Sequence, residues 1–429
     1  MAQHRGVLIS AYACNPKRGS EEAVGWNWVR TIAQNHKVTV ITAAFHKADI
    51  ASVCDLDANP RFVFVPQRWW HYRFTPFWRA VENSAAKPLM NMVYAHWQRD
   101  AWRVAKELVK SEHFDLVHQL TYVGYRFPGH MWKLGLPFVW GPVGGLENTP
   151  WRLLPAMGAA GALYYAGRNV INSAQRRWLR TPRRAAVAAG PGLIAGTEGI
   201  ARELMQAYGV KSRVIREVVA PVELSPPQPR RRQPSEPLRL VWSGLHLPGK
   251  ALNLLLAALG QIAASEPIEL HILGDGPLRK KWETSARSLG LDGRCVWHGK
   301  IDRREALAVM ANSHALVITS LKDLTSTVLL EGLALGLPVL CPDHCGFSGV
   351  VTEACGIKIE PRSISFLIDG FRSGVLRLAH DECTRYSMAL SAMERARAYS
   401  HDQLRRELDA VYSEVMCPVR IPCSIPIDN

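Results

Sequence analysis

The sequence predicts an α/β protein with two domains, each built on a Rossmann-like parallel sheet. In both halves, short apolar runs alternate with stretches rich in helix-forming residues, which is the pattern of parallel sheets covered by helices. Between the halves, residues 223–237 (ELSPPQPRRRQPSEP) are rich in Pro and Arg and lack apolar periodicity, which indicates a linker. A length of 429 residues is enough for two or three large cores.

The first domain, residues 1–222, opens with a predicted strand at 6–13 and a turn-rich loop that ends at Gly19. Ser20 follows as a helix cap, with two acids in the first helical turn. This order of elements resembles a Rossmann opening without the GxGxxG pattern, and a plain strand-to-helix turn is the alternative. Further strands are predicted at 37–43, 62–66, 115–121, 136–143 and 194–197.

The second domain, residues 238–400, repeats the pattern. A strand at 238–244 leads into a loop where Lys250 precedes an apolar helix, and a lysine there can reach a phosphate at the helix start. Residues 401–416 continue as a helix, and 417–429 show no readable structure. Further strands are predicted at 268–276, 295–299, 315–320, 338–341 and 357–360.

The stretch 321–332 (LKDLTSTVLLEG) joins two of these predicted strands and contains a helix start. Thr325, Ser326 and Thr327 are residue types that cap helices, and 328–335 is rich in helix formers. The unpaired amides at such a start, including that of Val328, lie at the positive end of the helix dipole and form an anion site.

Two acids flank this helix start. Asp323 is expected in the loop before the helix, and Glu331 about a turn and a half inside it. A ligand with polar groups on both sides of a diphosphate, such as a nucleotide sugar, suits this arrangement. The alternative is that Asp323 is a solvated loop acid and Glu331 a surface residue of the helix.

Positive charge is concentrated in the first half of the chain. The formal net charge is +15, and residues 1–220 hold 28 Lys and Arg against 14 Asp and Glu, which leaves 24 against 23 for the remainder. Such a face suits anionic lipid, a pyrophosphate-linked substrate or nucleic acid. Because 11 of the 14 Trp residues lie before residue 180, the composition favours a membrane interface over nucleic acid.

Two segments combine aromatic and basic residues. Residues 67–80 (QRWWHYRFTPFWRA) interleave Trp and Phe with Arg, and residues 151–184 carry seven Arg and no acid beside an apolar side. We interpret both as contacts with an anionic inner membrane surface. The alternatives are a helix packed on the sheet for the first segment, and a helix that bridges the two domains with a solvated basic face for the second.

Cysteine usage indicates a cytoplasmic protein. The nine cysteines are odd in number and scattered, which is typical of reduced thiols. The apolar stretch at 7–13 is too short for a signal peptide, and no run reaches the ~18 apolar residues of a spanning helix. We therefore expect a cytoplasmic chain that is at most peripheral on the membrane.

These motifs together resemble the family 4 retaining glycosyltransferases, which have the GT-B fold. Residues 323–331 match the family's acid-x7-acid motif, and GLALGLPVLCPDHCG follows it as in the family. Residues 270–320 match nearly element for element. At the N-terminus, SAYACNPKRGSEEAVGWNWV (10–29) is similar to a subgroup linked to bacterial exopolysaccharide and lipopolysaccharide, and the resemblance continues in DLVHQLTYVGYRFP (115–128) and FVWGPVGG (138–145).

The resemblance implies an activity and a set of site residues. It implies transfer of a sugar from a nucleotide-diphosphate donor to a glycan or lipid-pyrophosphate acceptor, with retained configuration and with neither a metal nor a cofactor. The first domain would hold the acceptor, and the helix at 401–416 would cross back to it. The implied roles are donor phosphate contacts for Gly19, Ser20 and Lys250, sugar contacts for Asp323 and His118, ribose contacts for Glu331, and base contacts for Lys300 and Ile301.

The chain departs from the family at one position. The family places an Arg directly after the glycine of the 244–250 loop, whereas this chain has Leu245 and then His246. The departure removes one positive charge from the diphosphate contacts, and His246 could replace it only weakly at neutral pH. Two alternatives stay open. The first is a GT-B binding or scaffold protein with impaired catalysis, and the second is another GT-B enzyme, such as a nucleotide-sugar epimerase or a phosphorylase.

Overall fold

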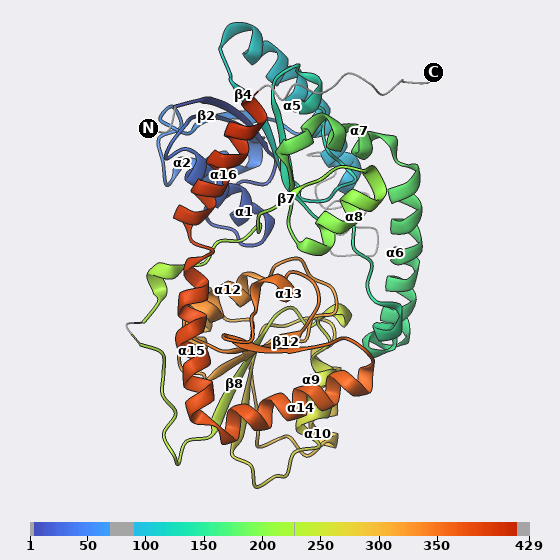
Figure 1. The fold of residues 1–429 in the computed structure, drawn as a ribbon, viewed down its shortest axis with the longest axis vertical. Coiled ribbons are helices and arrows are strands. Elements are labelled where there is room, and N and C mark those ends of the chain that lie inside the picture. Colours follow the sequence, from blue (N-terminus) through green and yellow to red (C-terminus); the bar gives the residue numbers. More distant parts are fainter. Residues whose placement is uncertain (1–3, 69–89, 227, 418–429) are drawn as a thin grey trace.

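The computed structural model describes residues 4–68, 90–226 and 228–417, which form two lobes stacked end to end (Figure 1). The predicted aromatic and basic segment at 67–80 therefore lies almost wholly outside the described residues. Within the described ranges, no helix has the length and apolar character needed to cross a bilayer.

The first domain has a seven-stranded parallel sheet in the described part of the chain, in the order β3-β2-β1-β4-β5-β6-β7. The central strands are buried on both sides because helices cover both faces, which explains their continuous apolar runs. The strands are β1 Gly6–Ala11, β2 Lys37–Ala43, β3 Arg61–Val65, β4 Leu116–Thr121, β5 Phe138–Val143, β6 Leu193–Ala195 and β7 Arg213–Val214. The helices are α1 Glu21–Ile32, α2 Lys47–Ala51, α5 Met90–Ser111, α6 Gly158–Trp178, α7 Arg180–Ala189 and α8 Glu198–Tyr208.

The second domain has a six-stranded parallel sheet among the residues described, in the order β10-β9-β8-β11-β12-β13. Its strands are β8 Leu238–Ser243, β9 Ile268–Leu273, β10 Cys295–Gly299, β11 Ala315–Val317, β12 Val339–Pro342 and β13 Gly356–Ile359. Its helices are α9 Leu252–Leu259, α10 Arg279–Ser288, α11 Arg303–Ala311, α12 Thr327–Ala334, α13 Phe347–Val350, α14 Ile364–His380 and α15 Glu382–Arg397. The two all-parallel sheets confirm the predicted fold class of two Rossmann-like domains.

The segment between β5 and α7 contacts the core of the second domain, although it precedes the predicted boundary at residue 222. The 3-10 helix η4 (Trp151–Met157) places Leu153, Leu154 and Met157 in the apolar core of the second domain. From there α6 runs along one side of the molecule back to the first domain (Figure 1). Residues 151–178 thus form a bridge between the lobes, which was one of the two interpretations of this basic segment.

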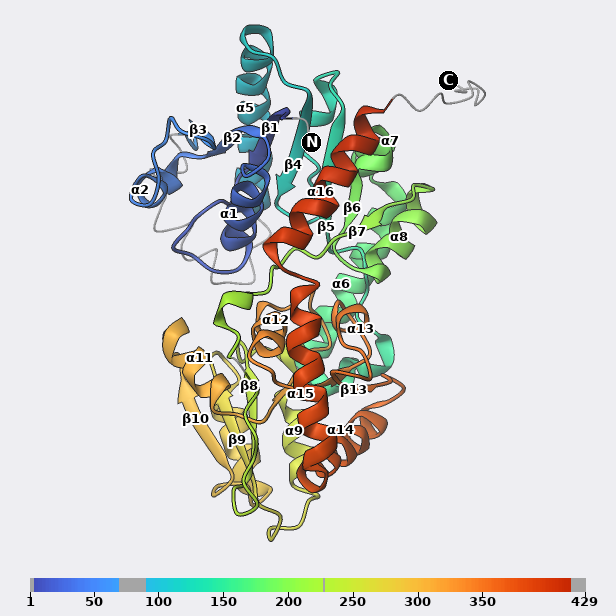
Figure 2. The same cartoon turned by 60° about the vertical axis from the view of Figure 1, so that its left-hand side comes forward.

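The last helix lies against the first domain. After α15 the chain bends and continues as α16 (His401–Met416), which Figure 2 shows in front of the upper lobe. Leu404, Leu408 and Val411 pack into the core formed by β1 and α1, because the apolar stripe of α16 faces that core.

Candidate active site at the domain interface

Two loops of the second domain are held together by hydrogen bonds to backbone carbonyls. The 3-10 turn η7 (Pro248–Lys250) precedes α9, and the loop after β11 precedes α12. The Leu321 amide donates to the Gly249 carbonyl at 2.8 Å, and the Thr319 hydroxyl donates to the Lys250 carbonyl at 2.5 Å. Both loops leave the carboxyl ends of parallel strands, where ligands bind in such sheets.

The fastened loops bring Lys250 and Asp323 into direct contact. The Lys250 Nζ lies 2.5 Å from the Asp323 Oδ2, and both side chains are mostly buried. The Asp323 backbone amide is held 3.3 Å from the Cys345 Sγ, and its Oδ1 accepts the Leu324 amide at 3.0 Å. The two residues predicted to act on the donor therefore form an ion pair whose carboxylate is fixed in orientation.

Leu324 attaches this loop to the first domain. A Cβ built on Gly144 would lie 3.2 Å from the Leu324 side chain, and one built on Gly196 would lie 3.4 Å from it. Gly144 directly follows β5. The loop that carries Asp323 is therefore seated between the two domains, and glycines leave room for it there.

The start of α12 has a free N-terminal turn. Ser326 is the N-cap residue with extended backbone and makes no side-chain capping bond, and Thr327 and Val328 begin the helix. The free amides of this first turn keep their hydrogen-bonding capacity for a ligand. The Thr325 amide, in contrast, donates to the Glu217 Oε1 at 2.7 Å.

Glu217 contacts the loop of Asp323 from the first domain and was not predicted from the sequence. It follows β7 in the first domain, is buried against the α12 loop, and leaves its Oε2 without a hydrogen-bond partner. Burial raises the pKa of this carboxyl to about 8, although the bonds from backbone amides oppose the shift. No local pattern around Glu217 reveals it, because its partner Thr325 lies 108 residues away in sequence.

Glu331 lies in the second turn of α12, buried and paired with Arg303. The Arg303 guanidinium contacts the Glu331 Oε1 at 2.9 Å. Burial raises the pKa of the Glu331 carboxyl, and the charge of Arg303 opposes that rise. The alternative that Glu331 is a surface residue is therefore wrong.

Lys300 and Ile301 form the short loop between β10 and α11. Ile301 is half-buried and packs on the apolar cluster that includes α12, whereas Lys300 is exposed. Arg303, at the start of α11, contacts Glu331, so this loop and Glu331 are neighbours. A basic residue two positions after Ile301 was the signal that could have pointed to Arg303.

Gly19 and Ser20 form an exposed turn before α1 in the first domain. Ser20 is the N-cap residue of α1, as predicted, but its φ is 59° and its side chain makes no capping hydrogen bond. The Cβ position of Gly19 has no heavy atom within 4 Å. The neighbouring Glu21 is partly buried and accepts the Val123 amide at 2.7 Å, and burial raises the pKa of its carboxyl to about 7. No contact among the described residues joins Gly19 or Ser20 to the Lys250–Asp323 pair.

His118 is a core residue of the first domain. It is fully buried, and its ring nitrogens lie 2.8 Å from the Tyr412 hydroxyl and 2.9 Å from the Gly141 carbonyl oxygen. Burial lowers the pKa of the imidazole to about 4, so it is neutral. With both nitrogens occupied, His118 serves to attach α16 to the sheet, and we leave it out of the proposed reaction.

The loop after β8 does not use His246 in place of the missing arginine. Leu245 is 62% exposed, whereas His246 is buried, and its ring centroid lies 5.1, 5.6 and 5.9 Å from those of Trp282, Trp242 and Trp297. Burial lowers the pKa of His246, and neither ring nitrogen has a partner. The expectation that His246 could replace the charge is wrong.

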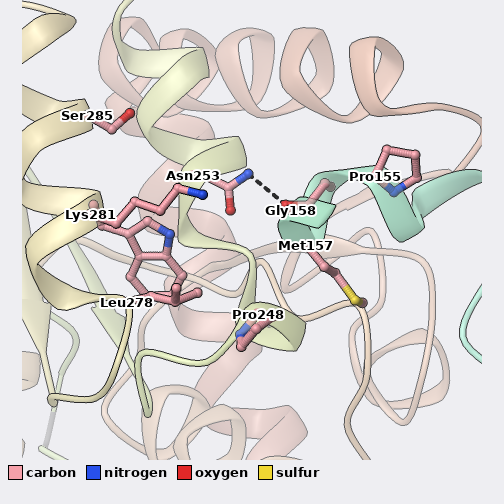
Figure 3. Close-up of a pocket in the computed structure, with 10 residues that line it drawn as sticks. Pro155, Met157, Gly158, Pro248, Asn253, Leu278, Lys281 and Ser285 are labelled. Atoms are coloured by element: carbon pink, nitrogen blue, oxygen red, sulfur yellow. Dashed lines mark hydrogen bonds between the residues drawn. The ribbon is translucent and has the colours of Figure 1, made fainter. Parts of the chain in front are cut away.

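A separate cavity of about 240 Å³ lies where the bridge meets the second domain. Figure 3 shows Pro155, Met157 and Gly158 on one side, with Pro248 and residues of α9 and α10 around the rest. Asn253 donates to the Ala156 carbonyl at 3.0 Å and holds this junction. The cavity shares Pro248 with the turn that carries Lys250, but it lies on the side of the bridge.

Known proteins similar to this chain were found by sequence and by structure. Residues 229–385 match the family Glycosyl transferases group 1. The lipopolysaccharide 1,6-galactosyltransferase of Salmonella typhimurium is 28% identical over 35% of this chain and 42% of its own length. The D-inositol 3-phosphate glycosyltransferase of a Nocardioides species is 26% identical over 79% of this chain and 77% of its own.

Among solved structures, Anabaena HepE in complex with UDP superimposes with a TM-score of 0.61 at 14% identity, covering 95% of this chain and 100% of that one. Such a likeness shows a common fold. The chain therefore has the GT-B fold, and its match to Glycosyl transferases group 1 over residues 229–385 supports a glycosyltransferase.

Proposed function

We propose that this protein is a retaining glycosyltransferase that transfers a sugar from a nucleotide-diphosphate donor to a glycan or lipid-pyrophosphate acceptor in the synthesis of a cell-surface polysaccharide. The observation that carries the proposal is the Lys250–Asp323 pair beside the free amides of α12. The similarity to a lipopolysaccharide galactosyltransferase and to a structure that holds UDP supports it.

Different residues of the second domain bind the phosphates and the sugar of the donor. Lys250 and the amides of Ser326, Thr327 and Val328 take up the negative charge that develops on the leaving diphosphate. Asp323 holds hydroxyls of the transferred sugar, so donor binding replaces the direct Lys250–Asp323 contact. This positive charge comes from the protein, and we therefore propose a reaction that needs no metal.

Glu331 binds the ribose, and the loop of Lys300 and Ile301 lies beside the base. Arg303 holds the Glu331 carboxylate in the absence of ligand and offsets part of the cost of its burial. Gly19 and Ser20 would complete the phosphate contacts from the first domain when the domains close on the donor. Retention follows if the acceptor hydroxyl attacks from the side of the departing diphosphate, with a donor phosphate oxygen as proton acceptor.

The acceptor is presented at an anionic membrane surface in this proposal, and α6 provides the contact. Positions seven residues apart lie on one side of a helix, because seven residues make nearly two turns. Five large apolar side chains at this spacing are more than half exposed, and 77% of Leu163 and 73% of Trp178 are accessible. The stripe consists of Leu163, Tyr164, Val170, Ile171 and Trp178.

The exposed arginines beside this stripe favour an anionic lipid surface as its binding partner. Arg177, Arg180, Arg183 and Arg184 are exposed on and directly after α6, and the sequence has no acid between Glu147 and Glu198. A basic helix with an exposed apolar side suits anionic headgroups, each basic residue contributing ~1 kcal/mol.

Thermal melting with UDP, GDP, ADP and TDP tests the donor assignment. We expect one nucleotide to stabilise the parent, by ~2.7 kcal/mol at about 100 times its dissociation constant, and to lose this effect in Glu331→Ala. Glu353→Ala removes an exposed acid from the same domain and should respond like the parent. A parent without any nucleotide response would contradict the proposal.

Product analysis separates the alternatives. Formation of a glycoside supports the transferase, whereas an isomerised or phosphorylated sugar would identify another GT-B enzyme. The exposed Leu245 favours the scaffold alternative, since it stands where a phosphate contact is expected. An active Leu245→Arg variant beside a silent parent would establish that alternative.

A further inference from the structure

A small polar cavity lies at the domain interface, next to Asp323. Its volume is about 30 Å³, which holds about two water molecules, or one ionised group rather than a sugar ring. Residues of the first domain, of α6 and of the second domain all contribute to it. Its lining residues include Arg126, Glu147, Tyr165, Arg168, Asn172 and Lys322.

Three cations from three parts of the chain meet at this cavity. Arg126 follows β4, Arg168 lies on α6, and Lys322 directly precedes Asp323. Within the described residues, none of the three forms an ion pair with a carboxylate. Arg126 and Lys322 are partly buried, and Arg168 is exposed at the mouth of the cavity. Unpaired cations gathered at one place repel one another, and an anion that joins them removes this cost.

Neutral groups hold the cations in place. Arg126 donates to the Asn172 Oδ1 at 2.6 Å and to the Gln175 Oε1 at 2.5 Å, and Arg168 donates to the Tyr164 hydroxyl at 3.1 Å. Lys322 donates to the Glu147 backbone carbonyl at 2.5 Å. These contacts fix the positions of the charges and neutralise none of them.

Glu147 is the one acid among the lining residues. Its carboxylate accepts the Thr197 hydroxyl at 3.0 Å, and burial raises its pKa while Thr197 and Lys322 oppose the rise. Burial lowers the pKa of Lys322, and Arg168 and Arg126 lower it further. Three cations against one acid leave the cavity with an excess of positive charge.

We propose that this cavity is an anion subsite, in which Arg126, Arg168 and Lys322 hold a phosphate or carboxylate group of one of the two sugars that the enzyme joins. The inference rests on the proposed function and specifies its substrates as anionic. Tyr165 connects the subsite to the reaction centre, because a Cβ on Gly249 would lie 2.7 Å from its hydroxyl, one residue from Lys250. Guanidinium and ammonium groups from different directions suit a compact anion.

Calorimetric titration of inorganic phosphate tests the subsite. The protein is first saturated with whichever of UDP, GDP, ADP and TDP stabilises it in the melting experiment, because that nucleotide occupies the donor phosphate contacts. We expect the parent to bind phosphate and Arg168→Gln and Lys322→Gln to bind it at least about ten-fold more weakly. Arg287→Gln removes the same charge from an exposed position of α10 outside the cavity lining and should match the parent.

Equal phosphate affinity in Arg168→Gln and Arg287→Gln, or no phosphate binding to the nucleotide-saturated parent, would overturn the subsite. Affinity for UDP, GDP, ADP and TDP, measured on the same samples, separates this failure from failure of the proposed function, which would abolish binding of all four nucleotides.

Two donors identify the source of the anion. If the parent prefers UDP-glucuronate to UDP-glucose by about ten-fold and Arg168→Gln loses that preference, the subsite holds the donor's carboxylate. If phosphate binds equally well beside UDP-glucose, and only Arg168→Gln and Lys322→Gln weaken it, the subsite holds the acceptor's anion. Either result supports the subsite.

Discussion

Single side chains at the interface determine how the loop of Asp323 is held. Glu217 reaches from the first domain to the Thr325 amide, at the entrance to α12. Its carboxyl is buried, and one of the two oxygens lacks a hydrogen-bond partner. This environment favours the protonated, neutral form.

The raised pKa of Glu217 gives a pH-dependent prediction. The pKa of this carboxyl is 4.5 in the unfolded chain and about 8 in the folded chain. Between these two pH values the folded state therefore binds the proton more tightly than the unfolded state. The free energy of unfolding therefore falls as the pH rises from about 4.5 to about 8 and levels off above.

Glu217→Gln keeps the shape and removes the ionisation. We expect its melting temperature to exceed that of the parent at pH 8 by at least ~2–4 °C, the shift given by one kcal/mol in a domain of this size, and by much less at pH 5. Calorimetric melting of both proteins across this range measures the difference. An offset independent of pH would show that Glu217 is ionised in the folded protein.

At the scale of elements, local periodicity predicted the ends of those strands and helices that are determined by residues near in sequence. The strands at 37–43 and 295–299 and the helix at 401–416 match β2, β10 and α16 at both ends, because each is a continuous pattern between turn residues. The strand expected at 315–320 ends at Val317, since its last residues leave the sheet to form the loop of Asp323.

The contacts of the site could be predicted only in part. The sequence placed Asp323 before α12 and Glu331 inside it, because both positions follow from one helix start. Glu217, Arg303 and Lys322 were missed, since their roles come from contacts with residues distant in the chain or from the other domain. His118 lies on a predicted strand, but spacing alone does not show that α16 covers it.

The exposed stripe of α6 gives a prediction for this element. Sedimentation with vesicles should show binding to those containing phosphatidylglycerol and weak binding to pure phosphatidylcholine. Leu163→Ser combined with Ile171→Ser should lower the bound fraction at least about ten-fold, since each replaces an exposed apolar group. Leu390→Ser, which changes an exposed leucine on α15, is the control.

Equal binding to neutral and anionic vesicles would contradict the electrostatic part of this proposal. A concentration-dependent dimer, seen by sedimentation velocity and abolished by the same double variant, would assign the stripe to a second copy of the chain instead.

At the scale of the whole molecule, the two domains are held in contact through the loop of Asp323. Leu324 packs against Gly144 and Gly196, and Lys322 donates to the Glu147 carbonyl. The loop of Asp323 therefore serves as a contact between the lobes. Separation of the domains requires that Leu324 leave its place against Gly144 and Gly196.

Leu324→Ser should weaken that contact. In small-angle scattering without ligand we expect a larger radius of gyration than for the parent, because an apolar contact worth about 1–3 kcal/mol is removed. Leu335→Ser is unsuitable as a control because Leu335 is buried, whereas the exposed Leu289 provides one in Leu289→Ser. An unchanged radius in Leu324→Ser would show that other contacts determine the closed arrangement.

The docking of η4 into the second domain has a consequence for protein engineering. A design that exchanges the first domain would place the cut in the inter-domain linker at residues 223–237. In this chain such a cut would separate Leu153, Leu154 and Met157 from the core that they complete. A second domain expressed from residue 223 onward would expose apolar surface and aggregate, and a chimera that keeps residues 151–157 native to that core should stay in solution.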